Sequence, residues 1–169
     1  MAERWAQHLK DKVIEPYSAG IIARGLNPRA VAVMKETGID IFHLSSKDVG
    51  SVMDIHFDHV ITVCSHAEQS CPVFPGKIQV THVPFDDPPS LAKSAKSEDE
   101  TLAHFRRVRD EIRVFIETLP LKQFKKFYYR TATRFIENLQ KSSSSITLKI
   151  TSKLTIGIFG YGFKRTMSS

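Results

Sequence analysis

The chain has 169 residues, 41% of them apolar, which is enough to bury one ordinary hydrophobic core. It contains no apolar run of 18 residues and no basic-then-apolar leader, so we expect no membrane span and a cytoplasmic location. The net charge of +6 is uneven, with +9 on residues 120–169 and −3 on residues 1–119, and this asymmetry alone is too weak to indicate nucleic-acid binding.

The first 119 residues alternate between helical and strand patterns. A helix start is expected at Pro28, with Asn27 as its cap, and Gly38 is typical of the residue just past a helix end. His59–Val63 is an almost continuous apolar run, as in a buried parallel strand. The expected order is a helix over 1–10, a strand over 13–17 with a turn at 18–20, a helix from 28 to about 38, a short helical turn that begins at 45–48, strands at 59–63 and 78–83, and a helix over 98–119.

This alternation predicts an α/β fold with a parallel sheet flanked by helices on both faces. Ligands of such folds bind at the carboxyl ends of the strands. Ser18, Cys64 and Asp87 each follow a predicted strand. We therefore expect all three to face one crevice.

The pattern changes after Pro120. Leu121–Gln140 has apolar residues on one helical face and basic residues elsewhere, and a serine run at 142–145 follows it. From Ile146 to Ile158 the apolar residues keep to even positions, which is the period of a strand. We therefore divide the chain into a domain over residues 1–119 and a basic tail over residues 120–169 whose role is open.

Two cysteines, Cys64 and Cys71, lie on one polar segment directly after the apolar run. Such a pair can form a reversible disulfide, serve as inert packing, or bind zinc with nearby His59, His66 and His82. The gap between the thiols does not match the usual cysteine spacing of structural zinc. From spacing alone, the redox interpretation is only narrowly ahead of the other two.

Several separate motifs occur in the order typical of one protein family. The motifs are Tyr17-Ser-Ala-Gly20, Gly25-Leu-Asn-Pro-Arg-Ala30, Cys64-Ser-His-Ala-Glu-Gln-Ser-Cys71-Pro72, Pro84-Phe-Asp-Asp-Pro88 and Phe105-Arg-Arg-Val-Arg-Asp110. Together they make residues 1–119 resemble the thioredoxin-coupled arsenate reductases, which have the low-molecular-weight tyrosine phosphatase fold.

The resemblance implies a role for each thiol. In that family a first thiolate attacks arsenate, a second thiol attacks the adduct and releases arsenite, and a third thiol presents the disulfide to thioredoxin. Cys64 matches the second thiol and Cys71 the third, while Asp87 matches the general acid. No cofactor is implied, and the expected partners are arsenate and thioredoxin. Spacing alone does not distinguish Asp87 from Asp86 as the acid.

The sequence departs from the family at its start. The family's first strand and its Cys-x5-Arg phosphate loop would precede Met1, so we expect the chain as written to be inactive, with a start codon assigned too late as the simplest explanation. The alternatives are a catalytically incomplete thiol-pair module for redox exchange or partner binding, and a phosphatase relative. Pro89-Ser90 stands where related phosphatases carry tyrosines, which favours a reductase over a phosphatase.

Two further expectations follow from the resemblance. Some members bind potassium, and Glu3, Ser18 and Ser45 match ligand positions of that site, but Lys47 replaces an acidic ligand and its ammonium group would stand in for the cation. We therefore predict no potassium requirement. We interpret the basic tail as loosely attached, and keep as the alternative that Leu154–Phe159 fills the place of the missing central strand.

Overall fold

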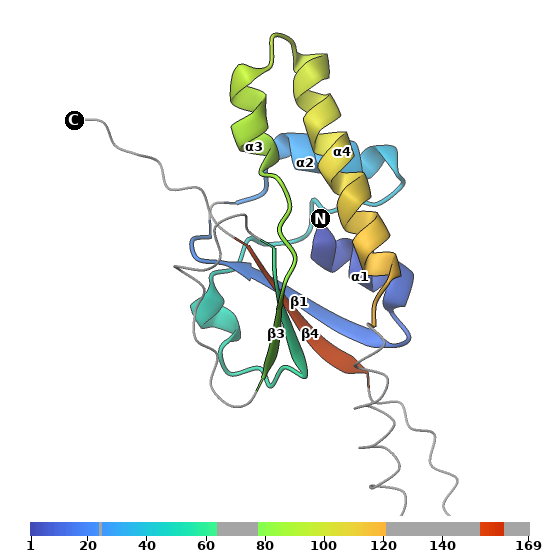
Figure 1. The fold of residues 1–169 in the computed structure, drawn as a ribbon, viewed down its shortest axis with the longest axis vertical. Helices are drawn as coiled ribbons and strands as arrows, with labels where there is room; N and C mark the ends of the chain where they lie inside the picture. The colour runs from blue at the N-terminus through green and yellow to red at the C-terminus, as the bar shows by residue number, and fades with distance from the viewer. Residues whose placement is uncertain (24, 64–77, 121–152, 161–169) are drawn as a thin grey trace, which may run out of the picture.

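The computed structural model describes residues 1–23, 25–63, 78–120 and 153–160. They form a four-stranded parallel sheet in the order β1-β4-β2-β3 with helices packed on it (Figure 1), which confirms the predicted α/β fold. The elements are α1 (Ala2–Lys10), β1 (Ile14–Gly20), α2 (Pro28–Glu36), the 3₁₀ helix η1 (Val49–Val52), β2 (His59–Thr62), β3 (Gln79–His82), α3 (Pro88–Leu91), the 3₁₀ helix η3 (Ala92–Ser94), α4 (Glu98–Glu117) and β4 (Leu154–Gly160).

The strand nearest the C-terminus is an inner strand of the sheet. β4 pairs in parallel with β1 along its whole length, from Ile14 opposite Leu154 to Gly20 opposite Gly160. On its other side it pairs with β2, where Ile61 lies opposite Ile158. β1 and β2 therefore do not pair with each other, and β4 joins them.

This position corrects the interpretation of the tail as loosely attached and confirms the alternative, in which Leu154–Phe159 takes the place of a central strand. Ile156 and Ile158 are 1% and 3% exposed, so the even-numbered apolar positions are buried as in a core strand. The opposite face of β4 buries Phe159 as well. The strand period of these residues is confirmed, whereas the predicted helical face of Leu121–Gln140 lies outside the described residues.

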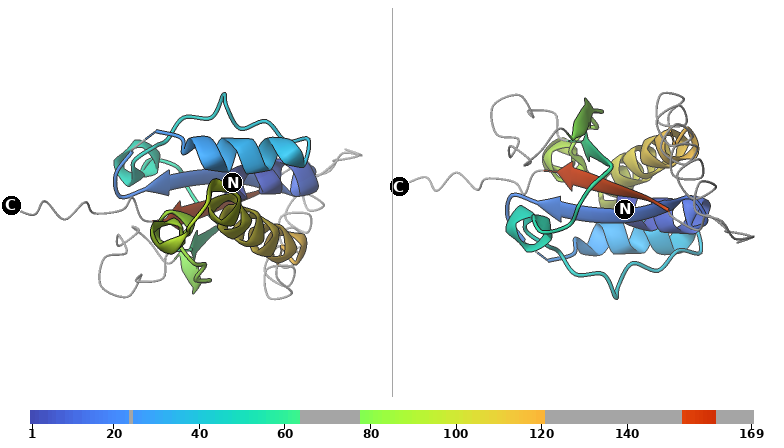
Figure 2. Two further views of the ribbon diagram at one scale, coloured as in Figure 1. Left: turned by 90° about the horizontal axis from the view of Figure 1, so that it is seen from above. Right: turned by 90° about the horizontal axis from the view of Figure 1, so that it is seen from below.

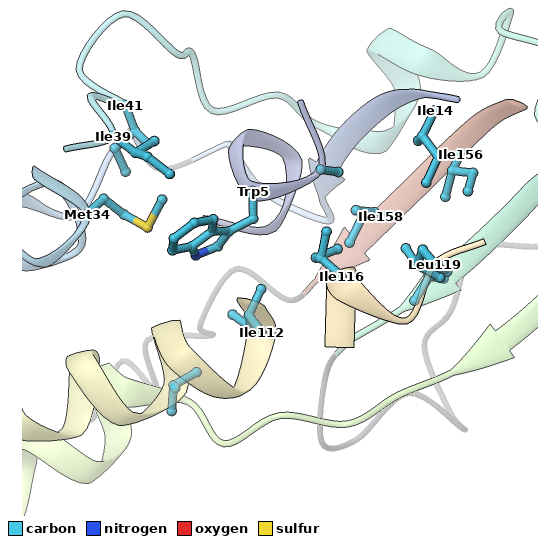
Figure 3. Packing of buried hydrophobic residues seen from close by; sticks show 13 residues of the cluster. Trp5, Ile14, Met34, Ile39, Ile41, Ile112, Ile116, Leu119, Ile156 and Ile158 are labelled. Atoms are coloured by element: carbon cyan, nitrogen blue, oxygen red, sulfur yellow. The ribbon is translucent and has the colours of Figure 1, made fainter. Parts of the chain in front are cut away.

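Two hydrophobic clusters cover the two faces of the sheet. The larger one joins α1, α2 and α4 to the strands, with Trp5, Met34 and Ile112 packed towards Ile156 and Ile158 (Figure 3). Figure 2 shows α4 in front of β4 in the view from above and behind it in the view from below. The smaller cluster lies on the other face and contains Val52 of η1 with Phe57, Val60 and Phe159. In the described part of the chain, that second face is covered by η1 and the segment after it rather than by an α-helix.

Local signals account for most helix boundaries. The side chain of Asn27 accepts hydrogen bonds from the N–H groups of Arg29 and Ala30, and Gly38 has a φ of +77°, as predicted for the two ends of α2. One prediction was wrong in detail, because β1 continues through the expected turn to Gly20. The short helical turn expected to begin at 45–48 is η1, which is capped by Asp48. The sequence patterns did not indicate α3 or η3.

Candidate functional site

The candidate site lies at the carboxyl edge of the sheet, where β2 and β3 end. Past β2, the N–H of Val83 bonds to the carbonyl of Thr62 at 2.8 Å and the N–H of Phe85 to that of Val63 at 3.2 Å. These bonds hold the segment that leads to Asp87 against the residue that precedes Cys64. Cys64 and Cys71 themselves lie outside the described residues.

The structure distinguishes the two adjacent aspartates, Asp86 and Asp87, which sequence spacing alone does not distinguish. Asp86 forms an ion pair with Arg107 of α4 at 2.7 Å. The carboxylate of Asp87 instead accepts a hydrogen bond from the hydroxyl of Ser90 at 2.6 Å. Asp87 is exposed at the start of α3. Of the two carboxyl groups, Asp87 is the one available to a ligand at this edge.

Arg107 connects the segment after β3 to α4. Its guanidinium bonds Asp86 at 2.7 Å and Glu111 at 2.6 Å, so it ties the loop after β3 to α4. The only sequence signal was its i, i+4 spacing to Glu111. Arg109, two residues further along α4, is buried and donates to the carbonyl of Val33 at 2.8 Å.

A second group of polar side chains surrounds Glu3 on α1. The Glu3 side chain is 9% exposed, and its carboxylate accepts hydrogen bonds from the N–H of Ser18 at 3.0 Å and from the Ser18 hydroxyl. The ammonium of Lys47 lies 3.3 Å from both carboxylate oxygens. A buried carboxylate is costly unless it is paired and hydrogen-bonded, and here it is both. The cluster fastens α1 to β1 and to the segment beside it.

This arrangement changes the roles expected for Ser18 and Ser45. Ser18 lies inside β1 and donates its hydroxyl to Glu3. Ser45 is exposed and lines a separate hollow of about 610 Å³ beside the start of α2. A potassium ion at Glu3 would have to displace the ammonium of Lys47, so the residues present do not fit a bound cation.

The histidines considered for zinc bond to threonines instead. The ring Nε2 of His59 lies 3.0 Å from the hydroxyl of Thr81, and Nδ1 of His82 lies 2.9 Å from that of Thr62. Burial lowers the pKa of His59 to about 4. Within the described residues, no three metal-ligating side chains gather at one point, and His66 lies outside them. No described helix is long and apolar enough to cross a membrane.

Comparisons with known proteins agree on one family. Residues 1–127 match the model of the low molecular weight phosphotyrosine protein phosphatases. The chain is 45% identical over 112 residues to an arsenate reductase of Bacillus subtilis, covering 66% of this chain and 78% of that protein. It is 47% identical over 113 residues to an arsenate reductase of Bacillus licheniformis, with the same coverage of 66% and 78%.

A solved structure supports the same relationship. The fold is similar to that of an arsenate reductase in its reduced state, with a TM-score of 0.55 at 28% identity, covering 70% of this chain and 83% of that one. The family match ends at residue 127, so β4 lies outside it. An inner strand of the sheet is thus contributed by residues that the family model does not include.

Proposed function

Because the chain belongs to the low molecular weight phosphotyrosine protein phosphatase family, and its relatives at 45–47% identity are arsenate reductases, we propose that its chemistry is the thiol-dependent reduction of arsenate to arsenite. The observation that carries this proposal is the pair of backbone bonds from Val83 to Thr62 and from Phe85 to Val63. They bring the loop bearing Asp87 beside the residue that leads into Cys64.

The thiols supply the electrons of the reaction. Reducing arsenate removes one oxygen as water and adds two electrons to arsenic, while two thiols become one disulfide. In our proposal, Cys64 attacks the sulfur of an arsenic–thiol adduct, arsenite leaves, and Cys71 then takes over the disulfide by thiol exchange. Thioredoxin reduces that disulfide in the cytoplasm, where such exchange partners keep thiols reduced.

Asp87 is the proposed proton donor to the oxygen that leaves arsenic as water. A general acid needs a carboxyl group that can approach the substrate and is not tied up by a cation. Asp87 is exposed and its carboxylate accepts a hydrogen bond from the Ser90 hydroxyl, whereas Asp86 forms an ion pair with Arg107. Ser90 is therefore proposed to orient the carboxyl group.

The sequence holds two cysteines, and both have roles late in this scheme. The thiol that opens the reaction is not among the 169 residues, so we propose that they turn over no arsenate and hydrolyse no phosphoester by themselves. The test is thioredoxin-coupled NADPH oxidation by the purified chain. A rate that depends on arsenate would contradict this part of the proposal.

The thiol relay has its own test. Oxidation with diamide should remove two hydrogens from the chain, as measured by mass spectrometry, and thioredoxin should restore them. Cys71→Ser should abolish this change. Zinc bound stoichiometrically by both thiols would instead support a structural metal site.

The role of Asp87 is tested against its neighbour. In a chain supplied with a Cys-x5-Arg segment before Met1, Asp87→Asn should lower the arsenate kcat by about 100-fold or more, the usual contribution of a general acid. Asp86→Asn is the matched control and should change kcat far less. Equal losses for the two variants would refute the assignment.

A further inference from the structure

The segment between β3 and α3 is anchored on both sides of Asp87. After it, Pro88 is buried as the first residue of α3. A residue that precedes proline is restricted to extended backbone, and Asp87 has that conformation, with φ −89° and ψ 105°. Before it, the N–H of Phe85 bonds the carbonyl of Val63 at 3.2 Å. Asp86 lies between these two fixed points, so the direction of the Asp87 side chain depends on how Asp86 is held.

Asp86 is held by a guanidinium group whose own direction is fixed. Nη1 of Arg107 bonds Glu111, one turn further along α4, at 2.6 Å, and Nη2 bonds Asp86 at 2.7 Å. The guanidinium is a rigid plane, so the bond of one nitrogen sets the direction of the other. Glu111 therefore directs Arg107 towards the segment that carries Asp86. The single nitrogen of a lysine has no such second bond to fix it in direction.

α4 is a firm support for this ion pair. Its residues Val108 and Ile112 are buried in the larger cluster. The same helix contacts the segment a second time, where the ring of Phe115 packs edge-on against that of Phe85, with centroids 6.0 Å apart. Arg107 and Phe115 are eight residues apart, which is about 12 Å along a helix. Two separated contacts prevent the segment from rotating against α4.

The ion pair is too exposed to matter much for folding. The side chains of Arg107, Asp86 and Glu111 are 45%, 57% and 42% exposed. Pairs as exposed as these contribute little to the stability of a protein. The consequence of the pair therefore lies in the geometry of the segment, and the residue next to the pair is Asp87.

We propose that Arg107 is the positioning residue of the acid: it holds Asp86 on α4 and so directs the Asp87 carboxyl group to the carboxyl edge of the sheet. This inference rests on the proposed function, in which Asp87 donates a proton. A cation bound to a carboxyl group favours its ionised form, which has no proton to donate. Asp86 is the anchoring carboxylate, and Asp87 is the one that serves the substrate.

Backbone relaxation of the 169-residue chain, measured by NMR, tests the positioning. Arg107→Gln should lower the order parameters of Asp86 and Asp87 from the range of rigid backbone, about 0.85, to below about 0.6. Urea unfolding should stay near the wild type. Arg113→Gln is the matched control, because Arg113 forms a similarly exposed pair with Glu117 on the same helix, and it should leave both order parameters unchanged. Unchanged order parameters in Arg107→Gln would overturn the proposal.

Exchange of the two charges makes the test specific. Asp86→Arg and Arg107→Asp should each release the segment when made alone. The chain with both substitutions has the same ion pair with its charges exchanged, so the order parameter of Asp87 should return to the wild-type range. Arg107→Lys should restore it only in part, because one nitrogen replaces two. A segment that stays mobile in the double variant would overturn the proposal.

Activity separates this proposal from the proposed function. In the chain supplied with a Cys-x5-Arg segment, Arg107→Gln should lower the arsenate kcat about 10-fold and leave KM unchanged, because a misplaced acid slows proton transfer without weakening binding. Turnover with an unchanged kcat in this variant would overturn the positioning role. If the parent chain turns over no arsenate, the proposed function fails, and the relaxation measurement still decides whether Arg107 positions Asp87.

Discussion

β2 and β4 are the two inner strands of one sheet, yet they come from different parts of the sequence. β2 lies inside the family match and all four of its residues are buried, while β4 lies beyond residue 127 and buries four consecutive residues, Ile156–Phe159. The two strands pair with each other residue by residue. Their equivalence indicates that an inner place in a sheet depends on residues that can be buried on both faces and on two neighbouring strands to pair with, and not on the position of a strand along the chain.

The largest expected effect is the loss of stability when a buried residue of β4 or of β2 is replaced, which tests whether the two strands are equally essential. Ile158→Asp and Ile61→Asp each place a carboxylate at the same buried level of the sheet and should each cost at least about 4 kcal/mol, a large part of the stability of a small domain. Urea unfolding measures both. The exposed control Lys153→Asp should stay near the wild type, and a mild effect of Ile158→Asp alone would show that β4 is not integral.

Substitution of Gly157 tests whether β4 is packed as closely against its neighbours as the structure shows. Gly157→Val should cost about 3 kcal/mol, because a Cβ atom there overlaps the ring of Phe159. Gly160→Ala is the matched control, since its Cβ would lie 3.3 Å from a methyl group of Val63 and should be tolerated much better. Equal thermal unfolding of the two variants would contradict the described packing.

The pH dependence of stability tests the burial of His59, which lies in β2. Burial lowers the pKa of His59 to about 4 from the ordinary 6.5, so the unfolded chain binds a proton more readily than the folded one between these values. Stability is therefore retained above pH 6.5 and falls as the pH drops towards 4, by on the order of 2 kcal/mol from this residue. His59→Gln, compared with the wild type across that range, should lose less stability on acidification. An identical loss in both proteins would exclude His59 as the cause.

The smallest effect concerns the cluster that fastens α1 to β1. Lys47→Ala removes the cation from Glu3 and should cost about 1 kcal/mol, because the lysine side chain is 30% exposed and solvent weakens the pair. Lys12→Ala, at an exposed position, is the control. Adding potassium chloride in place of sodium chloride should not stabilise the wild type. A specific gain with potassium would indicate that the ion competes with Lys47.

The sequence predicted those elements whose signals are local. α2 has a capping asparagine and a terminal glycine, and α4 has apolar residues every three or four positions, so both were found close to their true ends. The period of two from Ile146 to Ile158 also predicted a strand, and β4 covers Leu154–Gly160. Its place between β1 and β2 was kept only as an alternative, because sheet order depends on pairing across most of the chain.

The candidate site shows the same limit. Asp87 and Asp86 are equivalent by spacing, and only the packing of α4 brings Arg107 to one of them. The burial of Glu3 also had no local signal, since its partners Ser18 and Lys47 come from other segments. The roles of Cys64 and Cys71 rest on resemblance and stay predictions.

The order of the strands has a consequence for synthesis on the ribosome. β1 and β2 emerge long before β4, and at about 5–20 residues per second the interval between Thr62 and Leu154 lasts several seconds. Helices and hairpins form within microseconds, so the parts of the nascent chain that are already synthesised can fold before β4 is available to pair between β1 and β2. During that time the apolar residues that flank the place of β4, such as Ile14 and Ile61, are exposed to chaperones and to other nascent chains. The last strand to be translated is the one that closes the core.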